Sequence, residues 1–371
     1  MSWTLTSEFA FCQSLWPQLN YEDFIKRRDQ YSRYFYFIWE RLRFLNDNRA
    51  DYPMETLEDL TKLVGILRAD MSVKHDELVQ KHANSYEVSG EVMSRTFQAV
   101  AAIWLTCRIR INGVDVSHYD SYYTRHFDWN QDQSIVETLH ARLPAQSRAH
   151  EAAADDTIAD TFSMERLCKD HDFHMNWTNY LQDHLHIDWA NREIMFFQHF
   201  IYLHNYLDDE GTLSITPIPR NIIEEAADTI YLFFPETKGT SDFLKKKQWP
   251  PGGLLERGGR ARKLRISDYY HWYDQVRDLK KHSEEPPHGF RQLKPAHGRK
   301  DGRNCLDIVA LWTGVLVLLL TGITIVLGVA GVIYAKKSHD TEEEELKAVK
   351  AMACADANAA ARLVRGYCET F

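Results

Sequence analysis

Apolar residues recur at helical spacing through the first 106 residues of the chain. Asn20 is placed to cap a helix, and Pro53 is placed to begin a second one. The apolar stripe of the first helix has spacings of 4, 3, 4 and 3 residues and consists of Tyr31, Phe35, Ile38, Leu42 and Leu45. Further stripes follow over about 57–67, 72–82 and 88–105. Because each stripe has to be buried against the others, the sequence predicts an N-terminal helical bundle.

The period of the pattern changes to two at residue 107. Apolar residues alternate from Cys107 to Ile111 and again at Val114 and Val116, on either side of Asn112-Gly113. Asn-Gly between alternating apolar residues favours a two-residue hairpin turn, because both turn positions require a positive φ. We therefore expect a β-hairpin over about 107–117, closing a mostly helical region of residues 1–140.

The middle of the chain predicts a second, mixed region. The small and polar stretch 141–160 is typical of a linker, and 161–285 is expected to combine helices with short strands. A helix is predicted from Asn221 to Phe234, with Glu224 completing a capping box. The segment SDYYHWYDQVRDLKKH predicts one more helix, and the Pro/Gly/basic stretch 243–265 predicts a loop.

Residues 308–335 are 28 consecutive residues without a charge, flanked by Trp312 and Tyr334 near the two ends. A bilayer core needs roughly 20 helical residues, and aromatic residues favour its two interfaces. We expect one transmembrane helix, preceded by a juxtamembrane linker at 286–307. A short helical tail at 336–371 is expected to follow, capped by Thr341 with Glu344. The predicted fold class is thus mostly α, of the α+β kind: a helical N-terminal bundle, a small middle region with a β-hairpin, and one C-terminal transmembrane helix.

Charge is unevenly distributed along the chain. The formal net charge is −9, yet the stretch from Lys245 to Arg303 holds sixteen Lys/Arg against seven Asp/Glu. The N-terminal segment lacks the basic and apolar regions of a signal peptide, so we expect an integral, single-pass membrane protein whose N-terminal region is cytosolic. A basic segment beside an anchor favours anionic lipid headgroups. Its candidate contacts are Lys245, Lys246, Lys247, Arg260, Arg262, Lys263 and Arg265. Nucleic acid is the less favoured alternative partner.

Candidate chemistry is confined to histidine. Six of the seventeen histidines lie between residues 171 and 204, and CKDHDFH and DHLHID could each supply two ligands to a zinc ion. Neither HExxH nor a paired-cysteine motif accompanies them, and no GxSxG or phosphate-binding loop is present. The sequence therefore assigns no residue a catalytic, cofactor-binding or metal-binding role, and metal binding within 168–204 stays an alternative hypothesis.

Four motifs carry a resemblance to a known group. They are IWLTCRIRI with FDWNQDQS, then WTNYLQDHLHID, PRNIIEEAADTIYLFFP and YYHWYDQVRDL before the apolar segment. In these motifs the chain resembles a widespread family of uncharacterised fungal proteins with a large soluble N-terminal region and a C-terminal transmembrane helix. The resemblance covers most of the chain and implies this architecture, without an activity or a cofactor.

Two functional hypotheses follow. The first is a membrane-anchored cytosolic interaction or adaptor module, whose lipid contact is the bilayer itself through residues 308–335. The second is a membrane-tethered enzyme that uses the His/Asp-rich stretch 168–204, with or without a metal. The single sequon, Asn176-Trp177-Thr178, would report the orientation of the N-terminal region.

Overall fold

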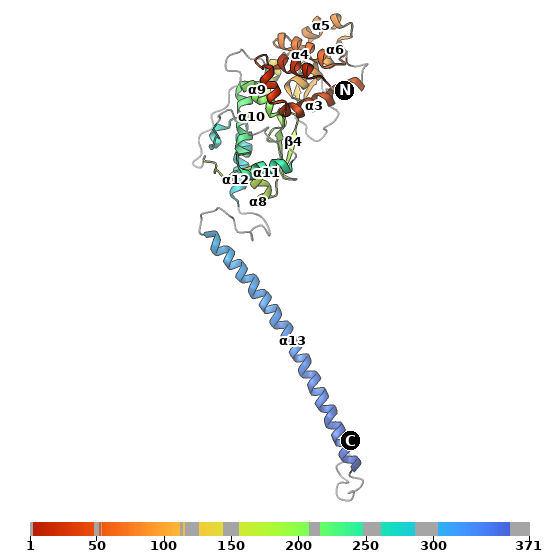
Figure 1. Ribbon diagram of the computed structural model, residues 1–371, viewed down its shortest axis with the longest axis vertical. Coiled ribbons are helices and arrows are strands. Elements are labelled where there is room, and N and C mark those ends of the chain that lie inside the picture. Colours follow the sequence, from red (N-terminus) through yellow and green to blue (C-terminus); the bar gives the residue numbers. More distant parts are fainter. Residues whose placement is uncertain are drawn as a thin grey trace. The chain divides into compact units, whose positions relative to one another are not determined.

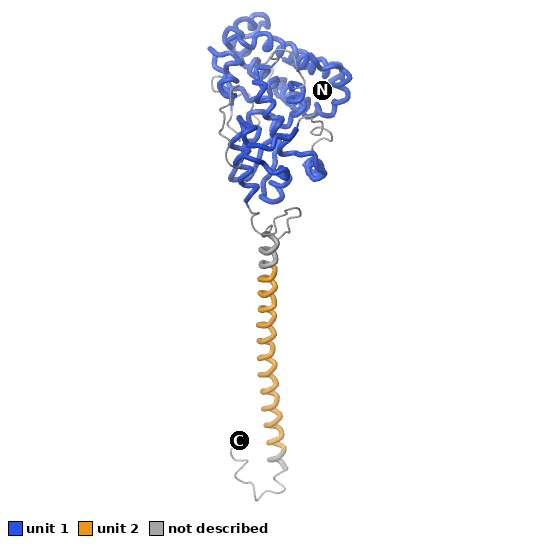
Figure 2. Tube along the Cα trace, turned by 90° about the vertical axis from the view of Figure 1, so that its left-hand side faces the viewer, with its two compact units in different colours: residues 1–287 blue, residues 288–371 orange. Residues whose placement is uncertain are grey.

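The computed structural model describes residues 3–47, 52, 54–111, 114–115, 126–143, 156–207, 216–247, 261–285 and 303–356. The chain divides into two compact units, residues 1–287 and 288–371 (Figure 2). Unit 1 combines many helices with two small sheets, whereas the described part of unit 2 is one long apolar helix. The structure therefore confirms the predicted fold class.

The first part of unit 1 is helical, as predicted. Asn20 caps α2, since its side-chain oxygen accepts the N–H of Asp23 at 2.8 Å. The chain bends at Arg27 before α3 begins, and the whole predicted stripe of α3 is buried. The helices are α1 (Leu5–Leu15), α2 (Tyr21–Lys26), α3 (Arg28–Asp47), α4 (Leu57–Ala69), α5 (His75–Ala83), a 3₁₀ turn η2 (Asn84–Tyr86) and α6 (Gly90–Leu105).

The predicted start of α4 at Pro53 is wrong. The helix begins at Leu57, because Thr56 and Asp59 form a capping box in which the side chain of each residue accepts the backbone N–H of the other. A capping box satisfies two free N–H groups at once, which an N-terminal proline does not do. Pro53 itself lies outside the described residues.

The predicted hairpin is confirmed. Strand β1 (Ile109–Ile111) pairs antiparallel with β2 (Val114–Asp115), and Ile111 lies opposite Val114. The predicted turn residues between these two positions, Asn112 and Gly113, lie outside the described part. Strand β3 (Phe127–Asp128) pairs parallel with β1 on its other side, and α7 (Ile135–Arg142) follows.

A second three-stranded sheet has the order β4-β6-β5. Its strands are β4 (His174–Thr178), β5 (Ile187–Asp188) and β6 (Glu193–Phe197). Strand β4 is parallel to β6 and joined to β5 through the turn η3 (Leu181–Asp183). The segment REIMFFQHFIYL, residues 192–203, is a strand only as far as Phe197. Its last residues begin α9 (Phe200–Leu207).

Helices α8 (Met164–His171), α10 (Arg220–Phe233), α11 (Lys238–Lys246) and α12 (Tyr273–Glu284), with the 3₁₀ turn η4 (Ile266–Asp268), complete unit 1. The predicted capping box at Asn221 is wrong: α10 begins directly after Pro219, and Glu224 pairs with Arg220 at 2.9 Å instead. The predicted loop 243–265 is helical in its first residues, because α11 extends to Lys246.

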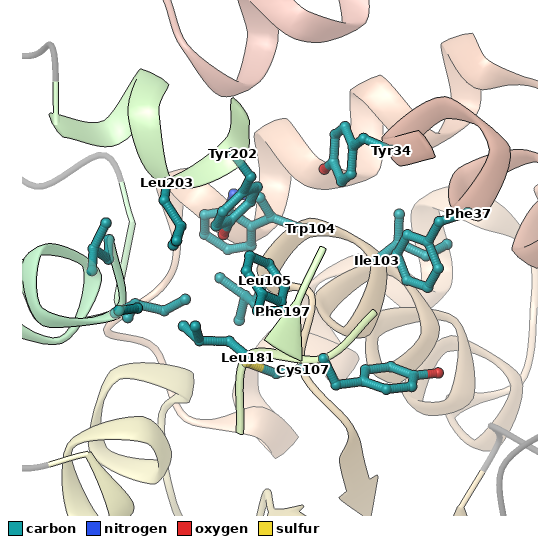
Figure 3. Close-up of a cluster of buried hydrophobic side chains, with 14 of the residues drawn as sticks. Tyr34, Phe37, Ile103, Trp104, Leu105, Cys107, Leu181, Phe197, Tyr202 and Leu203 are labelled. Carbon is teal, nitrogen blue, oxygen red and sulfur yellow. The ribbon is translucent and has the colours of Figure 1, made fainter. Parts of the chain in front are cut away.

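The predicted N-terminal and middle regions share one hydrophobic core. In Figure 3, Phe37 of α3 and Trp104 of α6 lie in the same cluster as Leu181, Phe197 and Tyr202 from the middle region. The end of the predicted linker also belongs to the packed unit, because Asp156 accepts the backbone N–H of Ser267 at 2.8 Å. Residues 1–287 are therefore one compact unit with its own core.

Unit 2 contains α13 (Arg303–Asp356), which includes the predicted transmembrane segment 308–335 and continues into the tail. Its most apolar window has a mean hydropathy of 2.7 and none of it is buried against protein, so α13 is long and apolar enough to cross a membrane. Thr341 does not begin a separate tail helix as predicted. Its hydroxyl donates to the carbonyl of Lys337 at 2.8 Å, because the helix runs on without a break.

Candidate interaction surfaces

His184, a candidate metal ligand, is fully buried with both ring nitrogens engaged. The N–H of Phe197 donates to Nδ1 at 3.2 Å, so the neutral ring carries its proton on Nε2, which lies 2.6 Å from the hydroxyl of Thr229. That hydroxyl donates onward to the carbonyl of Ala226 at 2.7 Å. Burial lowers the pKa of His184 to about 3. The ring therefore has no lone pair left for a metal, and its role is to join η3, β6 and α10.

The remaining histidines of 168–204 do not converge either. His199 is buried against aromatic rings, its Nε2 lies 2.9 Å from Oδ1 of Asn179, and burial lowers its pKa to about 3. His174 is exposed on β4, whereas His171 is buried at the end of α8. Within the described residues, which include all of 168–204, no three His, Cys, Asp or Glu side chains are grouped to hold a metal. The geometry thus gives the metal hypothesis no site.

Residues from all four motifs noted in the sequence hold the core together. Arg108 and Asp183 form a buried ion pair at 3.2 Å, and the Arg108 guanidinium lies over the ring of Tyr180. The carboxylate of Glu225 accepts the N–H of Trp272 at 2.8 Å, and the indole of Trp272 donates to the carbonyl of His184. Burial raises the pKa of Glu225, although the N–H groups at the start of α12 oppose this. These contacts tie the elements of unit 1 together.

The basic stretch divides into residues used inside unit 1 and residues that face water. Arg262 donates to the carbonyls of Asp160 and Leu232, both at 2.6 Å, and Lys263 pairs with the buried carboxylate of Asp228 at 2.6 Å. By contrast, Lys245, Lys246, Lys247 and Arg265 are exposed and face water. Arg260 lies outside the described residues.

A groove with an arginine-rich rim lies along the outer side of α3. It consists of two adjoining hollows of about 420 and 390 Å³, which share Glu40 and Asn179. The first is lined by Ser32, Arg33, Tyr36, Glu40, Asn179 and Gln198, and the second by Phe37, Trp39, Glu40, Arg41, Arg43, Phe44, Asp47 and Asn179. We call this feature the α3 groove. Volumes of this size are those of ordinary ligand sites.

The rim of the α3 groove presents aromatic rings and guanidinium groups together. Tyr36 is 59% exposed, its ring lies 6.0 Å from that of Trp39, and the Arg43 guanidinium lies 5.6 Å from the Trp39 ring. The carboxylate of Glu40 bonds the Tyr36 hydroxyl and raises the pKa of that phenol. Because these residues recur at helical spacing, their side chains form one row along the outer side of α3.

The opposite wall of the α3 groove is held rigidly by the segment after β4. Asn179 accepts from Gln198 and lies beside Nε2 of His199, and Gln198 in turn accepts from Arg33 at 3.0 Å. Arg41 donates to the hydroxyl of Tyr180. Sequence analysis missed this groove, because it joins residues about 140 positions apart; the one available sign was the row Tyr36, Trp39, Arg43 on the polar side of a buried helix.

Comparison with known proteins places this geometry in no known class. No protein-family model, no curated protein and no solved structure matches the chain.

Proposed function

We propose that the chain is a membrane-anchored interaction module, held at a membrane by α13 and binding an acidic segment of a partner protein in the α3 groove. Support for the anchor comes from the length and apolar character of α13, whose side chains have no protein to pack against among the described residues. Support for the interaction comes from the α3 groove, which is hollow, solvent-facing and built on a rigid helix.

The row of Tyr36, Trp39 and Arg43 is the single observation that carries the proposal. Tyr, Trp and Arg are the residue types that contribute most binding energy in protein interfaces. They are rigid or planar, so little conformational entropy is lost when a partner covers them. Here they lie in contact with one another at the mouth of a hollow, whereas the opposite side of the same helix is buried in the core.

Charge favours an acidic occupant. The rim holds Arg33, Arg41 and Arg43, while Glu40 is bonded to a phenol and Asp47 lies at the far end of the helix. Guanidinium groups pair with carboxylates in a planar, two-point geometry. A partner segment that carries Asp or Glu next to an apolar side chain would place the carboxylates on the rim and the apolar group over Phe37.

Photocrosslinking tests this proposal in the native membrane. The full chain would carry p-benzoylphenylalanine in place of Tyr36, or in place of Tyr21 on α2 as a matched control of similar exposure (59% and 49%). We expect a discrete adduct from position 36 that mass spectrometry maps to an acidic segment, and none in common with position 21. Arg43→Glu should reduce the adduct at least tenfold, and Lys62→Glu on α4 should not. Adducts shared by both positions, or untouched by Arg43→Glu, would overturn the proposal.

The orientation is part of the same proposal: residues 1–287 lie in the cytosol. Asn176 is exposed on β4, so an oligosaccharyltransferase would reach its sequon if the region were lumenal. Protease added to sealed membranes should digest an N-terminal tag and leave a C-terminal tag intact, with Asn176 unmodified. A protected N-terminal tag together with glycosylated Asn176 would reverse the orientation. The relationship to the fungal family stays a prediction.

A further inference from the structure

Helix α12 is the last described element of unit 1 before the chain reaches α13. This helix ends at Glu284, and in its last turn the ring of His282 lies 4.8 Å from that of Trp189 and 6.2 Å from that of Phe173. Only 17 residues, 286–302, separate the described end of unit 1 from Arg303 of α13. A fully extended segment of this length spans about 60 Å at most. Chain connectivity therefore limits the distance between the end of α12 and the first residue of α13 to about 60 Å.

The lysines at the end of α11 belong to the same surface. Helix α8 packs against both α11 and α12 (Figure 1). A Cβ at Gly239, in the first turn of α11, would meet the carboxylate of Glu165 on α8 at 2.4 Å, so the two helices are in close contact. At the other end of α11, the charge of Lys247 acts on Cys168, opposing the burial that raises the pKa of this thiol to about 11. Lys247, at the C-terminal end of α11, thus lies near the last turn of α8, which contains Cys168.

Trp189 is fixed at the tip of the turn between β5 and β6. The carboxylate of Asp188 accepts the N–H groups of Ala190 and Asn191 at 2.9 and 3.1 Å, which closes the turn. The indole stays 44% exposed although it contacts His282. Indole rings favour the boundary between apolar lipid and water.

The exposed lysines of this surface are not paired with carboxylates among the described residues. Among the described residues, Lys245, Lys246, Lys247 and Lys281 are exposed and take part in no ion pair, whereas Lys280 pairs with Glu284 at 2.8 Å and Arg166 with Asp170 at 3.5 Å. The neighbouring carboxylates of Glu284 and Asp170 are therefore largely offset by their own partners. Arg262 and Lys263 are engaged inside unit 1 and do not contribute.

From this arrangement we infer that the exit surface, which consists of Lys245, Lys246, Lys247, Lys281 and Trp189, binds the anionic headgroups of the bilayer that holds α13. Each lysine near an anionic leaflet strengthens binding about fivefold, and the short tether to the span removes most of the cost of bringing the two together. Unit 1 is thereby held in one orientation, with the exit surface on the membrane. This inference stands apart from the α3 groove, which uses different residues and a different partner.

Hydrogen exchange on the full chain tests the inference. The protein would be reconstituted in nanodiscs of phosphatidylcholine, with or without phosphatidylserine, and exchange followed at 186–192 and 243–247. We expect phosphatidylserine to slow exchange in both segments by at least threefold, and the effect to vanish in high salt. Inorganic phosphate should not reproduce the protection, because a dissolved ion lacks the surface density of a leaflet.

Variants make the test decisive. A variant in which Lys245, Lys246, Lys247 and Lys281 are all replaced by Gln should lose the protection, whereas Lys26→Gln with Lys62→Gln, on α2 and α4, should keep it. All these side chains are exposed, so the variants are expected to fold, and an unchanged Tm would verify this. Residues 1–287, which form a unit with its own core, should sediment with phosphatidylserine vesicles at least tenfold more weakly in the fourfold variant. Equal protection with and without phosphatidylserine, or equal loss in the control variant, would overturn the inference.

Discussion

Helices α10 and α13 are both rich in apolar residues, yet these residues are buried in α10 and exposed in α13. Most of α10 is buried, with Ile222, Ile223 and Leu232 each no more than 1% exposed. Along α13 the same kinds of side chain are open, with Leu318 74% and Val332 70% exposed. A protein surface rarely leaves so much contiguous apolar area in water. The comparison indicates that the apolar side chains of α13 require an apolar environment outside the protein, whereas those of α10 are covered by the rest of unit 1.

Their polar groups differ in the same way. In α10, Glu225 and Asp228 take partners from elsewhere in unit 1, namely Trp272 and Lys263, at 2.8 and 2.6 Å. In α13, the hydroxyls of Thr321 and Thr324 donate to carbonyls of their own helix, both at 2.8 Å. A helix that satisfies its own polar groups can lie in lipid, where no other partner is available. In unit 1, polar side chains instead bond to residues of other segments, and these bonds determine which elements pack together.

The largest expected effect comes from placing charge in α13. Arg at position 318 and at position 326 should each cost about 2.5–3.5 kcal/mol at the centre of a span, so Leu318→Arg with Val326→Arg should abolish membrane retention. Alkaline carbonate extraction followed by sedimentation measures this. The matched control is Leu346→Arg with Val349→Arg, which changes residues of the same helix that are 55% and 57% exposed but lie beyond residue 335. A double variant at 318 and 326 that still resists carbonate would break the comparison.

The next effect concerns the buried ion pair of unit 1. Arg108→Ala leaves the carboxylate of Asp183, which is 0% exposed, without its partner, and should lower the free energy of unfolding by about 3–5 kcal/mol. Arg110→Ala, two residues away, removes a pair with Asp128 that is more than a third exposed and should cost less than about 1 kcal/mol. Urea unfolding of residues 1–287 measures both. Equal losses in the two variants would show that burial does not determine how much unfolding free energy is lost when an ion pair is removed.

Features set by local spacing and features set by long-range contacts differ in how far the sequence predicted them. The apolar segment 308–335 and the stripe of α3 were predictable because local spacing alone determines them. The pair Arg108–Asp183, the buried state of His184 and the α3 groove were not, because each joins residues that are distant in sequence. The capping boxes predicted at Asn221 and Thr341 were wrong, since the same spacing also occurs inside helices. Of the exit surface, the sequence analysis named only Lys245, Lys246 and Lys247, and it missed Lys281 and Trp189.

A third test uses pH. The pKa values of His184 and His199 are about 3 in the folded protein, below the usual value of about 6.5 expected for the unfolded chain. As pH falls below 6.5 the unfolded state therefore takes up protons that the folded state does not, and stability is lost. Between pH 7.5 and 5.5 the two histidines should together cost roughly 2–3 kcal/mol. Glu225, whose pKa burial raises, acts with the opposite sign.

The contribution of one histidine is isolated by His199→Gln. This variant keeps a donor for Asn179 but cannot titrate, so it should lose about half of the pH dependence in urea unfolding of residues 1–287. An unchanged pH dependence in His199→Gln would mean that this ring is protonated, or open to water, in the folded protein.

The smallest effect compares two tyrosines on one face of α3, both fully buried. The hydroxyl of Tyr31 accepts from Nδ2 of Asn205 at 2.8 Å, whereas that of Tyr34 has no hydrogen-bond partner among the described residues. Tyr31→Phe should therefore destabilise residues 1–287 by about 1 kcal/mol, and Tyr34→Phe should be neutral or stabilise them by up to about 1 kcal/mol. Thermal unfolding of the two variants side by side measures the difference. A loss at Tyr34 equal to that at Tyr31 would mean that the Tyr34 hydroxyl is also hydrogen-bonded, to an ordered water.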